Sequence, residues 1–442
     1  MPRNAPLLLL LLAYLAVGTL YAVRTPAWQA PDEPAHYNYI RQLAAGKLPT
    51  IEASDYDEEY RRRIVSSRFA PQYSIAPLTY EDWQPPLYYL LQTPLYLLAE
   101  GQLLVLRLFS LLLGAGVVVA AYGVAGTIWP GRHWWALLAA SFVAFLPQHV
   151  AMLASVNNDA LAELLIGAML WLLLSTLLVP RAPERRQHRW WWLGLLLGLG
   201  FLTKASVYIM AVVLGLALVV FYRHRRGPMR RAAIGLALPS LALGALWWVR
   251  NLAVYRGLDP LGIQAHDAVV VGQTRTVEWI DSYGLAETLQ RMLQTTFRSF
   301  WGQFGWMGVV MDSRIYLLLL LFSILVLAGI GLALARILFR GPAGITFEQR
   351  LALIVLTATF LLSLLVYVGY NVTYVQHQGR YLFPALIPIS LAVATGIGTW
   401  VRPAVRRWRW TGYAVAAAFG LALAGLDIVA LYRFIVPQLA GP

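Results

Sequence analysis

Long apolar runs recur along nearly the whole of this sequence, and they restrict what the chain can fold into. A helix needs roughly 20 mostly apolar residues to cross the hydrocarbon core of a bilayer, and runs of that order predict about eleven membrane-spanning helices. The predicted spans are residues 6–23, 103–127, 134–149, 156–179, 190–203, 206–222, 232–253, 315–336, 350–370, 381–400 and 411–432. We therefore expect an all-α polytopic membrane protein in which residues 1–442 form a single membrane domain.

The composition agrees with this class of protein. The chain is 59% hydrophobic and only 13% charged, whereas soluble globular proteins carry about 25% charged residues. The first run, 6–23, is too long for the apolar core of a signal peptide, and no small-residue cleavage site precedes Thr25, so we expect it to remain as a span. The sequence contains no cysteine, which excludes disulfides and thiolate metal sites.

The distribution of positive charge predicts the orientation of the chain. A net charge of +14 would suit a nucleic-acid-binding protein, but the arginines cluster in short gaps between apolar runs, as the positive-inside rule describes. The densest clusters are 181–189, 223–231 and 402–409. With a cytoplasmic N-terminus, alternating spans place each cluster in the cytoplasm. We therefore expect no nucleic acid partner, a location in the inner (plasma) membrane, and contacts with membrane lipids.

One part of the span count has a second interpretation. Residues 190–222 could form one broken helix around Thr203 and Lys204 instead of two spans. That arrangement would invert every later span and put the basic segments 336–350 and 402–409 on the outer side, which the positive-inside rule disfavours. We therefore predict two spans in this region.

The alternation leaves two long segments on the outer side, 24–102 and 255–314. Both mix charged, aromatic and proline residues, while the inner loops are short and basic. We expect these two segments to form a helical outer cap, with the active site facing the periplasm or exterior. The chain continues only briefly after its last predicted span, so the cap is also where we expect an acceptor to be selected.

The stretch PDEPAHY (31–37) is the strongest candidate for chemistry, because it places Asp32 and Glu33 directly after the first span. Two adjacent carboxylates can have their pKa values pushed apart, which leaves one of them able to act as a base near neutral pH. An alternative is that Asp32 caps the helix that follows, where the helix dipole favours carboxylates. Both roles can hold together.

Two cations are predicted at the outer ends of spans. Arg380, in HQGRYLFP (377–384), is placed either to bind a phosphate or to anchor its span at the interface. Lys204 lies between two apolar runs, where a lysine is unfavourable unless it has an anionic partner. The same two roles, phosphate binding and interface anchoring, stay open for Lys204, and its need for an anionic partner favours the functional one.

Further candidates for substrate binding lie on the same side of the predicted membrane. The stretch NNDA (157–160) opens a span, and its polar residues can cap that helix or bind sugar hydroxyls. In EDWQPP (81–86) aromatic and acidic residues are neighbours, as they are on sugar-binding surfaces and equally at membrane interfaces. The candidates for substrate binding are Trp83, Gln84, Asn157, Asn158, Asp159 and His377.

Cofactor motifs are missing from the sequence. No histidines have the spacing of zinc ligands, and there is neither a Walker loop nor a dinucleotide fingerprint. We therefore expect no metal, no other cofactor and no soluble nucleotide substrate. A hard divalent cation held by Asp32, Glu33 or Asp159 is compatible with the sequence but is not required by it.

The order of several motifs resembles the GT-C superfamily of integral membrane glycosyltransferases, which includes the protein O-mannosyltransferases and the aminoarabinose transferase of lipid A. The motifs are Asp32-Glu33-Pro34 with His36, QPPLYY (84–89), NNDAL (157–161), GLLLGLGFLTKAS (194–206), WWVRN (247–251) and GRYLFP (379–384). Three stretches, DEPAHY, SFWGQFGWM and GRYLFP, are most similar to a bacterial and archaeal branch described only as membrane proteins.

This resemblance implies a GT-C-like fold and an inverting transferase. Such an enzyme moves a sugar from a polyprenyl-phosphate donor to an acceptor, which can be a glycan, a lipid or a protein. The resemblance implies that Asp32 is the base, with Glu33 as the second candidate, and that Arg380 binds the donor phosphate with help from Lys204. His36 is expected to orient the acidic pair or to contact the phosphate.

Two other kinds of protein stay open as alternatives. A glycan polymerase or ligase would use the same kind of lipid-linked donor. A membrane transporter or lipid flippase would explain the many spans, but it would call for charged residues paired deep within several of them. The polar stretches of this sequence instead gather on one side of the predicted membrane, which favours the transferase.

Overall fold

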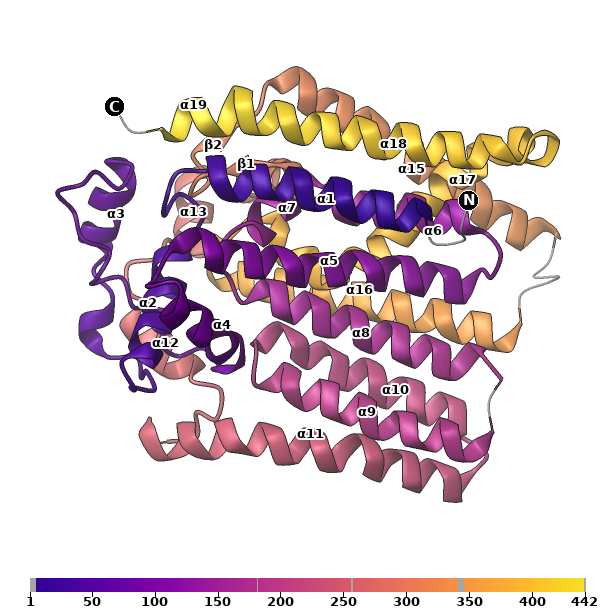
Figure 1. The fold of residues 1–442 in the computed structure, drawn as a ribbon, viewed down its shortest axis with the longest axis horizontal. Coiled ribbons are helices and arrows are strands. Elements are labelled where there is room, and N and C mark those ends of the chain that lie inside the picture. Colours follow the sequence, from indigo (N-terminus) through magenta and orange to yellow (C-terminus); the bar gives the residue numbers. More distant parts are fainter. Residues whose placement is uncertain (1–4, 181, 256, 341–345, 441–442) are drawn as a thin grey trace.

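Long helices lie side by side in a bundle, with short helices gathered at one end (Figure 1). The computed structural model describes residues 5–180, 182–255, 257–340 and 346–440. Parts of the predicted basic segments, residue 181 and residues 341–345, lie outside the described residues. The fold is all-α except for one short two-stranded hairpin.

Nine helical segments within the described residues are long and apolar enough to cross a membrane. They are formed by α1 (Ala5–Arg24), α5 (Leu103–Ile128), α8 (Asp159–Leu178), η2–α10 (Ala205–Tyr222), α11 (Arg226–Val254), α15 (Ser313–Arg340), α16 (Phe347–Thr373), η3–α17 (Gly379–Arg407) and α18–η4–α19 (Trp410–Leu439). The pair α6 (His133–Ala144) and α7 (Pro147–Leu153) passes the same test only as a whole and bends by 64°, so it is either a tenth, broken span or a re-entrant loop. The chain is therefore a multi-pass membrane protein, as predicted.

One of the eleven predicted spans, residues 190–203, is not supported by the length and composition of its helix. It corresponds to α9 (Pro183–Phe201), which begins with the charged sequence ERRQHR and so falls short of an uninterrupted apolar run. The helix nevertheless packs along α8 and α11 within the bundle (Figure 1). Small residues allow this contact, because a side chain at Gly194 would collide with the backbone of α11 at Gly235.

The helices α9 and α10 are two elements and not one broken helix. The chain turns between them at Thr203 and Lys204, and it does so beside the start of α8, where Lys204 contacts Asp159. Helix α10 then runs back towards the basic segment that precedes α11. Residues 190–222 therefore form two helices joined by a turn, as the two-span interpretation required, but only the second, η2–α10, is long and apolar enough to cross a membrane.

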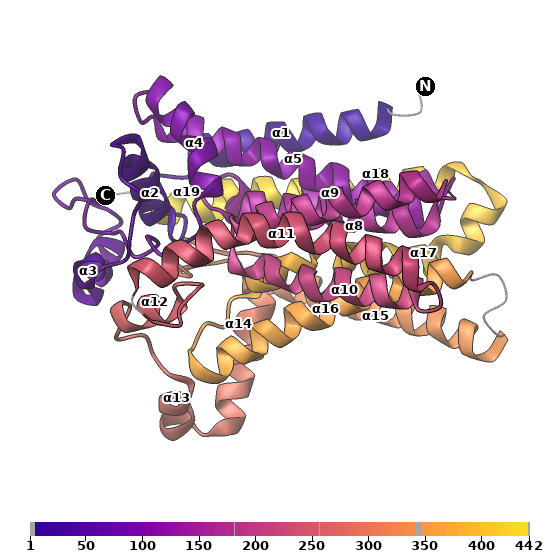
Figure 2. The same cartoon turned by 90° about the horizontal axis from the view of Figure 1, so that it is seen from below.

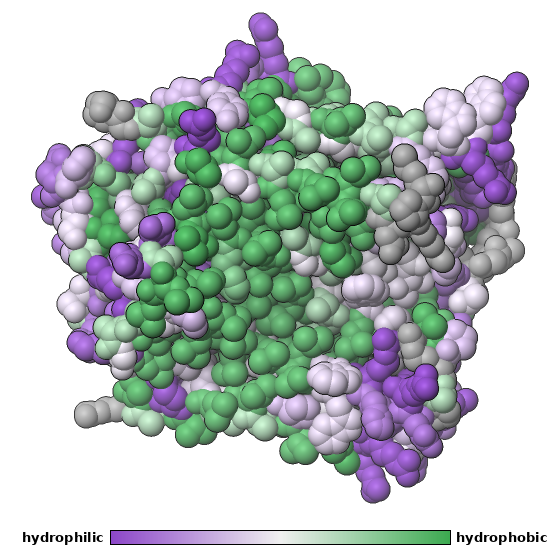
Figure 3. Space-filling view, in the orientation of Figure 1, coloured by the Kyte–Doolittle hydropathy of each residue, from purple (hydrophilic) through white to green (hydrophobic). Residues whose placement is uncertain are grey.

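The sides of the bundle carry the apolar surface that a bilayer requires. Leucines are strongly exposed there, among them Leu318 and Leu327 on α15 and Leu365 on α16. Figure 3 shows a broad apolar band across the face in view, with hydrophilic residues gathered at its two ends. Exposing leucine side chains in this way is unfavourable in water, whereas lipid chains solvate them.

The cap comes from the two predicted segments, and it is largely helical. The first segment contributes α2 (Glu33–Ala44), η1 (Ala53–Asp55), α3 (Glu58–Ser66) and α4 (Leu87–Leu98). The second contributes α12 (Ile263–Val269), α13 (Thr276–Tyr283), α14 (Leu285–Trp301) and the antiparallel strands β1 (Gln303–Phe304) and β2 (Val309–Val310). Figure 2 shows α13 and α14 projecting from the bundle at this end.

A small hydrophobic core of its own joins the two segments of the cap. Ile64 and Leu78 from the first segment are fully buried in it, together with Val270 from the second. Burying such side chains contributes about 1.5–3 kcal/mol each. The cap is therefore a packed layer, and it holds the loops that follow α1 and precede α4 against the ends of the spans.

Candidate functional site

Asp32 occupies the turn between α1 and α2 in an unusual backbone conformation. It stands at the N-cap of α2 with φ 66° and ψ −6°, the left-handed region that non-glycine residues rarely adopt. Its side chain makes no capping hydrogen bond. The predicted capping position is therefore correct, but the carboxylate points elsewhere. Strained positions of this kind cost of order 1–3 kcal/mol and concentrate at functional sites.

The Asp32 carboxylate is held between two other cap-end residues. Arg380 Nη2 donates to Oδ2 at 2.9 Å, and the Tyr80 hydroxyl donates to Oδ1 at 3.0 Å. Burial by itself would raise the pKa of Asp32, but the charge of Arg380 and the hydrogen bonds from Arg380 and Tyr80 outweigh it and lower the pKa below its usual value. Asp32 is therefore ionised at neutral pH, and about a quarter of its side chain stays exposed, at 24%.

Glu33 lies in a different environment from its neighbour. Its side chain is completely buried and forms two hydrogen bonds with Arg107, from Nη2 at 2.6 Å and from Nε at 2.7 Å. The backbone N–H groups of Trp28 and Val156 also donate to it, at 3.1 Å and 3.2 Å. Both carboxylate oxygens are thus occupied inside the protein. This geometry suits a residue that holds the turn in place rather than one that meets a substrate.

Arg107 connects this ion pair to the end of the first span. Its guanidinium also donates to the carbonyl oxygens of Ala22, Thr25 and Pro26. The Glu33–Arg107 pair therefore joins α1, α2 and α5 directly beneath Asp32. Arg107 lies within a predicted span and was not among the sequence-based candidates, although a charged residue within an apolar run is itself a signal.

Arg380 is the second residue of the segment η3 (Gly379–Ala385), at the cap end of α17. Its guanidinium is mostly buried, donates from Nε to Gln378 Oε1 at 2.7 Å, and lies against the ring of Tyr381. Helix α14 packs directly on the preceding residue, because a Cβ at Gly379 would meet the backbone of Thr296 and Phe300. The position of Arg380 thus depends on a close backbone contact with the cap.

We expect Gly379→Ala to shift this contact and with it Arg380. Overpacking of this kind typically costs about 1–3 kcal/mol, and the free energy of unfolding in detergent measures it. Gly331→Ala is the matched control, since nothing lies within 4 Å of a Cβ at that position on α15. Equal stability of the two variants would contradict the importance of the α14 contact.

Lys204 has an anionic partner, which a lysine between two apolar runs requires. Its Nζ lies 2.7 Å from Oδ1 of Asp159, the first residue of α8. Asn157 Oδ1 accepts a hydrogen bond from the Asp159 backbone N–H at 2.8 Å, so Asn157 orients the start of the helix. Asn158 is at the N-cap without capping, and its amide donates instead to Gln84 Oε1 at 3.2 Å.

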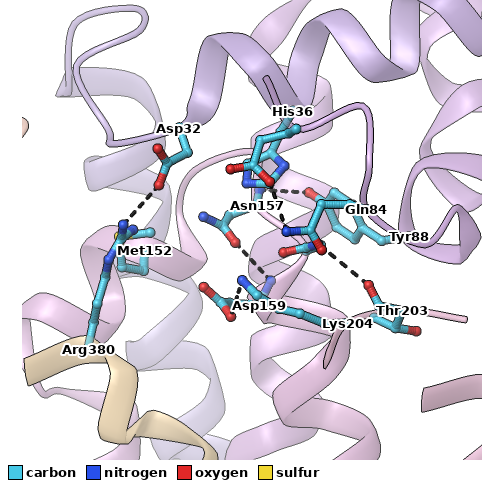
Figure 4. A network of polar contacts seen from close by, with 12 residues as sticks. Asp32, His36, Gln84, Tyr88, Met152, Asn157, Asp159, Thr203, Lys204 and Arg380 are labelled. Carbon is cyan, nitrogen blue, oxygen red and sulfur yellow. Dashed lines mark hydrogen bonds and ion pairs between the residues drawn. The ribbon is translucent and has the colours of Figure 1, made fainter. Parts of the chain in front are cut away.

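The two ion pairs belong to one cluster. Figure 4 shows Asp32 and Arg380 pointing towards each other, with Asp159 and Lys204 beside them. Arg380 acts electrostatically on both Asp32 and Asp159, and Lys204 contacts Asp159 directly, so these groups lie near one another. Residues that are separated by up to 348 positions in the chain are thus brought together at one end of the bundle.

His36 lies in this cluster as a neutral group. It is buried, and its Nδ1 is 2.8 Å from the hydroxyl of Tyr89. Burial, and next the positive charge of Lys204, lower the pKa of His36 to about 3. At neutral pH it can exchange a hydrogen bond with a ligand, but it brings no positive charge to a phosphate.

Two predicted substrate-binding residues pack against other parts of the cap. The Trp83 ring lies on His266 of α12, with ring centroids 4.9 Å apart. His377 lies edge-on to Trp279 of α13, with centroids 5.4 Å apart. Within the described residues, neither side chain hydrogen-bonds to either ion pair. Gln84, by contrast, is held at the cluster by Asn158.

Glu81 is a cluster residue that the sequence-based candidates did not include. It is half-buried, and its Oε2 accepts a hydrogen bond from Gln84 Nε2 at 2.9 Å. Burial, and next the negative charge of Asp32, raise the pKa of Glu81 to about 8. The acidic pair in EDWQPP was visible in the sequence, but no pattern indicated that Glu81 faces Asp32.

Metal binding has no support from the geometry of the part of the chain that the structure describes. No three acidic or histidine residues in it are arranged to hold a metal ion. The positive charges at the cluster are those of Arg380 and Lys204.

Comparison with known families identifies the chain. Residues 70–389, well over half of the sequence, match the family described as "Predicted membrane protein (DUF2142)". The chain belongs to the DUF2142 family. No protein of curated function matches it.

Solved structures show which fold this DUF2142 protein has. It is similar to ArnT from Cupriavidus metallidurans, solved bound to undecaprenyl phosphate, with a TM-score of 0.53 and 16% identity over 99% of this chain and 74% of ArnT. It is also similar to the oligosaccharyltransferase of Archaeoglobus fulgidus, solved with a tethered acceptor peptide, with a TM-score of 0.56 and 13% identity. The DUF2142 protein spans 56% of that transferase. The fold is therefore of the GT-C type, as the motif order implied.

Proposed function

We propose that this DUF2142 protein is an inverting glycosyltransferase that moves a sugar from a polyprenyl-phosphate donor to an acceptor. The observation that carries the proposal is the cluster at the cap end, where two cations and an ionised, partly exposed carboxylate lie together. The cations are Arg380 and Lys204, and the carboxylate is Asp32.

The solved relatives support this donor class in general terms. ArnT is bound to undecaprenyl phosphate, and the archaeal oligosaccharyltransferase carries an acceptor peptide. A lipid phosphate and an acceptor are thus the kinds of ligand that proteins of this fold bind. The acceptor of the present chain can be a glycan, a lipid or a protein.

The chemistry assigns one role to each group. An acceptor hydroxyl gives its proton to Asp32 as its oxygen attacks the anomeric carbon from the face opposite the phosphate. The bond between that carbon and the phosphate oxygen breaks, and its electron pair leaves with polyprenyl phosphate, so the configuration inverts. Arg380 and Lys204 stabilise the charge that grows on the phosphate. General-base catalysis of this kind contributes about 10²–10⁴-fold.

The resting ion pairs give this mechanism an order. Arg380 bonds to Asp32 before any donor is present, so a phosphate must compete with that carboxylate for the guanidinium. When the phosphate takes Arg380, Oδ2 of Asp32 loses its partner and becomes free to accept the acceptor proton. Donor binding would thus activate the base. Glu33 keeps its bonds to Arg107 throughout and holds the turn that carries Asp32.

The proposal also includes an orientation. The arginine-rich segments 223–231 and 402–409 lie at the end of the bundle opposite the cap. The positive-inside rule then puts that end in the cytoplasm together with the N-terminus. The cluster would face the periplasm or exterior from the inner (plasma) membrane.

The first experiment is donor turnover by the purified protein in nanodiscs. A panel of polyprenyl-phosphate sugars is offered together with glycan, lipid and peptide acceptors, and release of polyprenyl phosphate is followed. We expect one donor to be turned over, and Arg380→Gln and Lys204→Gln each to weaken its binding about 10–100-fold, the value of a hydrogen bond between charged groups.

Arg291→Gln is the matched control, because this cap arginine pairs with Glu287 on the surface of α14. It should leave donor binding within about twofold, as expected for an exposed pair. Donor binding that is equal in Arg380→Gln and Arg291→Gln would contradict the phosphate site. Movement of an intact lipid across the membrane, with no sugar transferred, would favour a flippase, and joining of whole glycans would favour a polymerase or ligase.

A further inference from the structure

The charge balance of the cluster identifies a residue without a counterion. Asp32 is paired with Arg380 and Asp159 with Lys204, each through a direct contact below 3 Å. Glu81 is a third carboxyl group at the cluster, because it follows Tyr80, whose hydroxyl donates to Asp32. Among the residues that the structure describes, its one side-chain hydrogen-bond donor is the neutral amide of Gln84. If all three carboxyl groups were ionised, the cluster would carry a net negative charge and would repel an anionic donor.

The orientation of Glu81 is set by a chain of side-chain contacts that starts on a span. Asn158, at the beginning of α8, donates to Gln84 Oε1, and the Gln84 amide in turn donates to Glu81 Oε2. Gln84 and Asn158 are both buried, so the contacts are shielded from water. Glu81 itself is only half-buried. Its second oxygen, Oε1, has no hydrogen-bond donor among the described residues.

We propose that Glu81 is a further substrate-binding residue of this site, and that its carboxyl group in the neutral acid form donates a hydrogen bond to an oxygen of the donor phosphate. A carboxyl group can donate only when it is protonated. Together with the two ion pairs, a neutral Glu81 leaves the cluster without net charge, so a singly charged phosphodiester can enter. This inference rests on the proposed donor and adds a third contact to it.

The surroundings of Glu81 favour the neutral form. Burial and the negative charges of Asp32 and the adjacent Asp82 oppose the ionisation of Glu81. Together they outweigh the positive charges of Lys204 and Arg380, which favour it. The titratable and charged groups that act on Glu81 from its own segment and from the elements around it are Asp32, Tyr80, Asp82, Tyr89, Lys204, Tyr370 and Arg380. With its pKa near 8, Glu81 is mostly protonated at pH 7 and mostly ionised at pH 9.

The test measures binding of a phosphodiester probe at pH 7 and pH 9. The probe is the methyl diester of a polyprenyl phosphate, which has no proton to lose in this range, and the full-length protein is used in nanodiscs at constant ionic strength. We expect the Kd of the unaltered protein to rise about tenfold from pH 7 to pH 9, in proportion to the loss of the acid form. Glu81→Gln still donates but no longer titrates, so its Kd should change less than about twofold.

Two further variants keep the result interpretable. Asp82→Asn is the matched control, because burial also raises the pKa of Asp82 to about 8 while its side chain bonds to Gln42 of α2. It should keep the tenfold change. Glu81→Ser also donates without titrating at these pH values, and it should give a flat profile if the Gln variant misfolds.

The outcomes separate this inference from the function it rests on. A tenfold change that persists in Glu81→Gln and Glu81→Ser, or a pH-independent Kd in the unaltered protein, would overturn the role of Glu81 and leave the donor site standing. Failure of the unaltered protein to bind the probe at either pH would instead count against the lipid-phosphate donor, and against the Glu81 contact with it.

Discussion

Asp32→Asn is expected to lower turnover by about 10²–10⁴-fold, the usual contribution of a general base. The amide cannot accept the acceptor proton as a carboxylate does. At the same time the variant removes the negative charge that holds Arg380 in the resting state, at 2.9 Å. Donor binding should therefore be retained or become tighter, so that turnover and affinity change in opposite directions. Turnover of the donor and its Kd, measured on the same preparation, test both parts.

The pH dependence of the unaltered protein adds a check on this assignment. Although burial opposes it, the charge of Arg380 keeps the pKa of Asp32 below its usual value, so the base is already ionised at pH 5. Between pH 5 and 7 the kcat/KM for the donor, which reports the free protein with Arg380 on Asp32, should therefore show no titration of Asp32. Asp57→Asn is the matched control, since Asp57 is an exposed carboxylate of the same segment at the N-cap of α3. If Asp32→Asn turned over the donor as fast as Asp57→Asn, Asp32 would not be the base.

Arg107→Met is expected to lower the free energy of unfolding by about 3–5 kcal/mol, because it leaves Glu33 charged and buried without a partner. Both side chains of the pair are almost inaccessible, at 4% and 0% exposed. The three backbone carbonyl groups that Arg107 contacts also lose their donor. Denaturant or thermal unfolding in one detergent measures the loss. The double variant Arg107→Met with Glu33→Leu should recover part of it, since no charge is then left unpaired.

The exposed pair Glu59–Arg63 provides the comparison for that experiment. Its side chains are 81% and 55% exposed, and Arg63→Met should cost no more than about 1 kcal/mol. Equal losses in Arg107→Met and Arg63→Met would contradict a structural role for the buried pair. Glu33→Gln separates the two roles of Glu33. If it abolished turnover while leaving unfolding and donor binding unchanged, Glu33 would take part in the chemistry and its assignment as a positioning residue would be wrong.

The sequence was sufficient for features that depend on short stretches of chain. The length and composition of an apolar run are local properties, and the bilayer has a fixed thickness. The nine segments that are long and apolar enough to cross it could therefore be found without a structure. The helix α9 shows the limit of this argument. Its charged beginning interrupts the apolar run, and its place beside α11 depends on Gly194 packing against a residue 41 positions later, Gly235.

The sequence also indicated which residues needed partners, but not which partners they have. A lysine between apolar runs calls for an anion, and tertiary structure identifies that anion as Asp159. Asp32 and Glu33 are adjacent in the chain and looked equivalent as candidates. The left-handed turn at Asp32 sends the two carboxylates in different directions, one to Arg380 and the other to Arg107. Their different partners are what favour Asp32 over Glu33 as the base.

What the sequence alone determined is the class of protein, the number of spans to within one or two, the end of the bundle at which the candidate residues gather, and most members of the cluster. Only the tertiary structure decided how the charges pair, that Glu33 is enclosed, and that Glu81 faces the site. The physical reason is the range of the interactions. Membrane insertion and capping act over one helix, whereas ion pairing and burial depend on where distant helices meet, as Asp32 and Arg380 do across 348 residues.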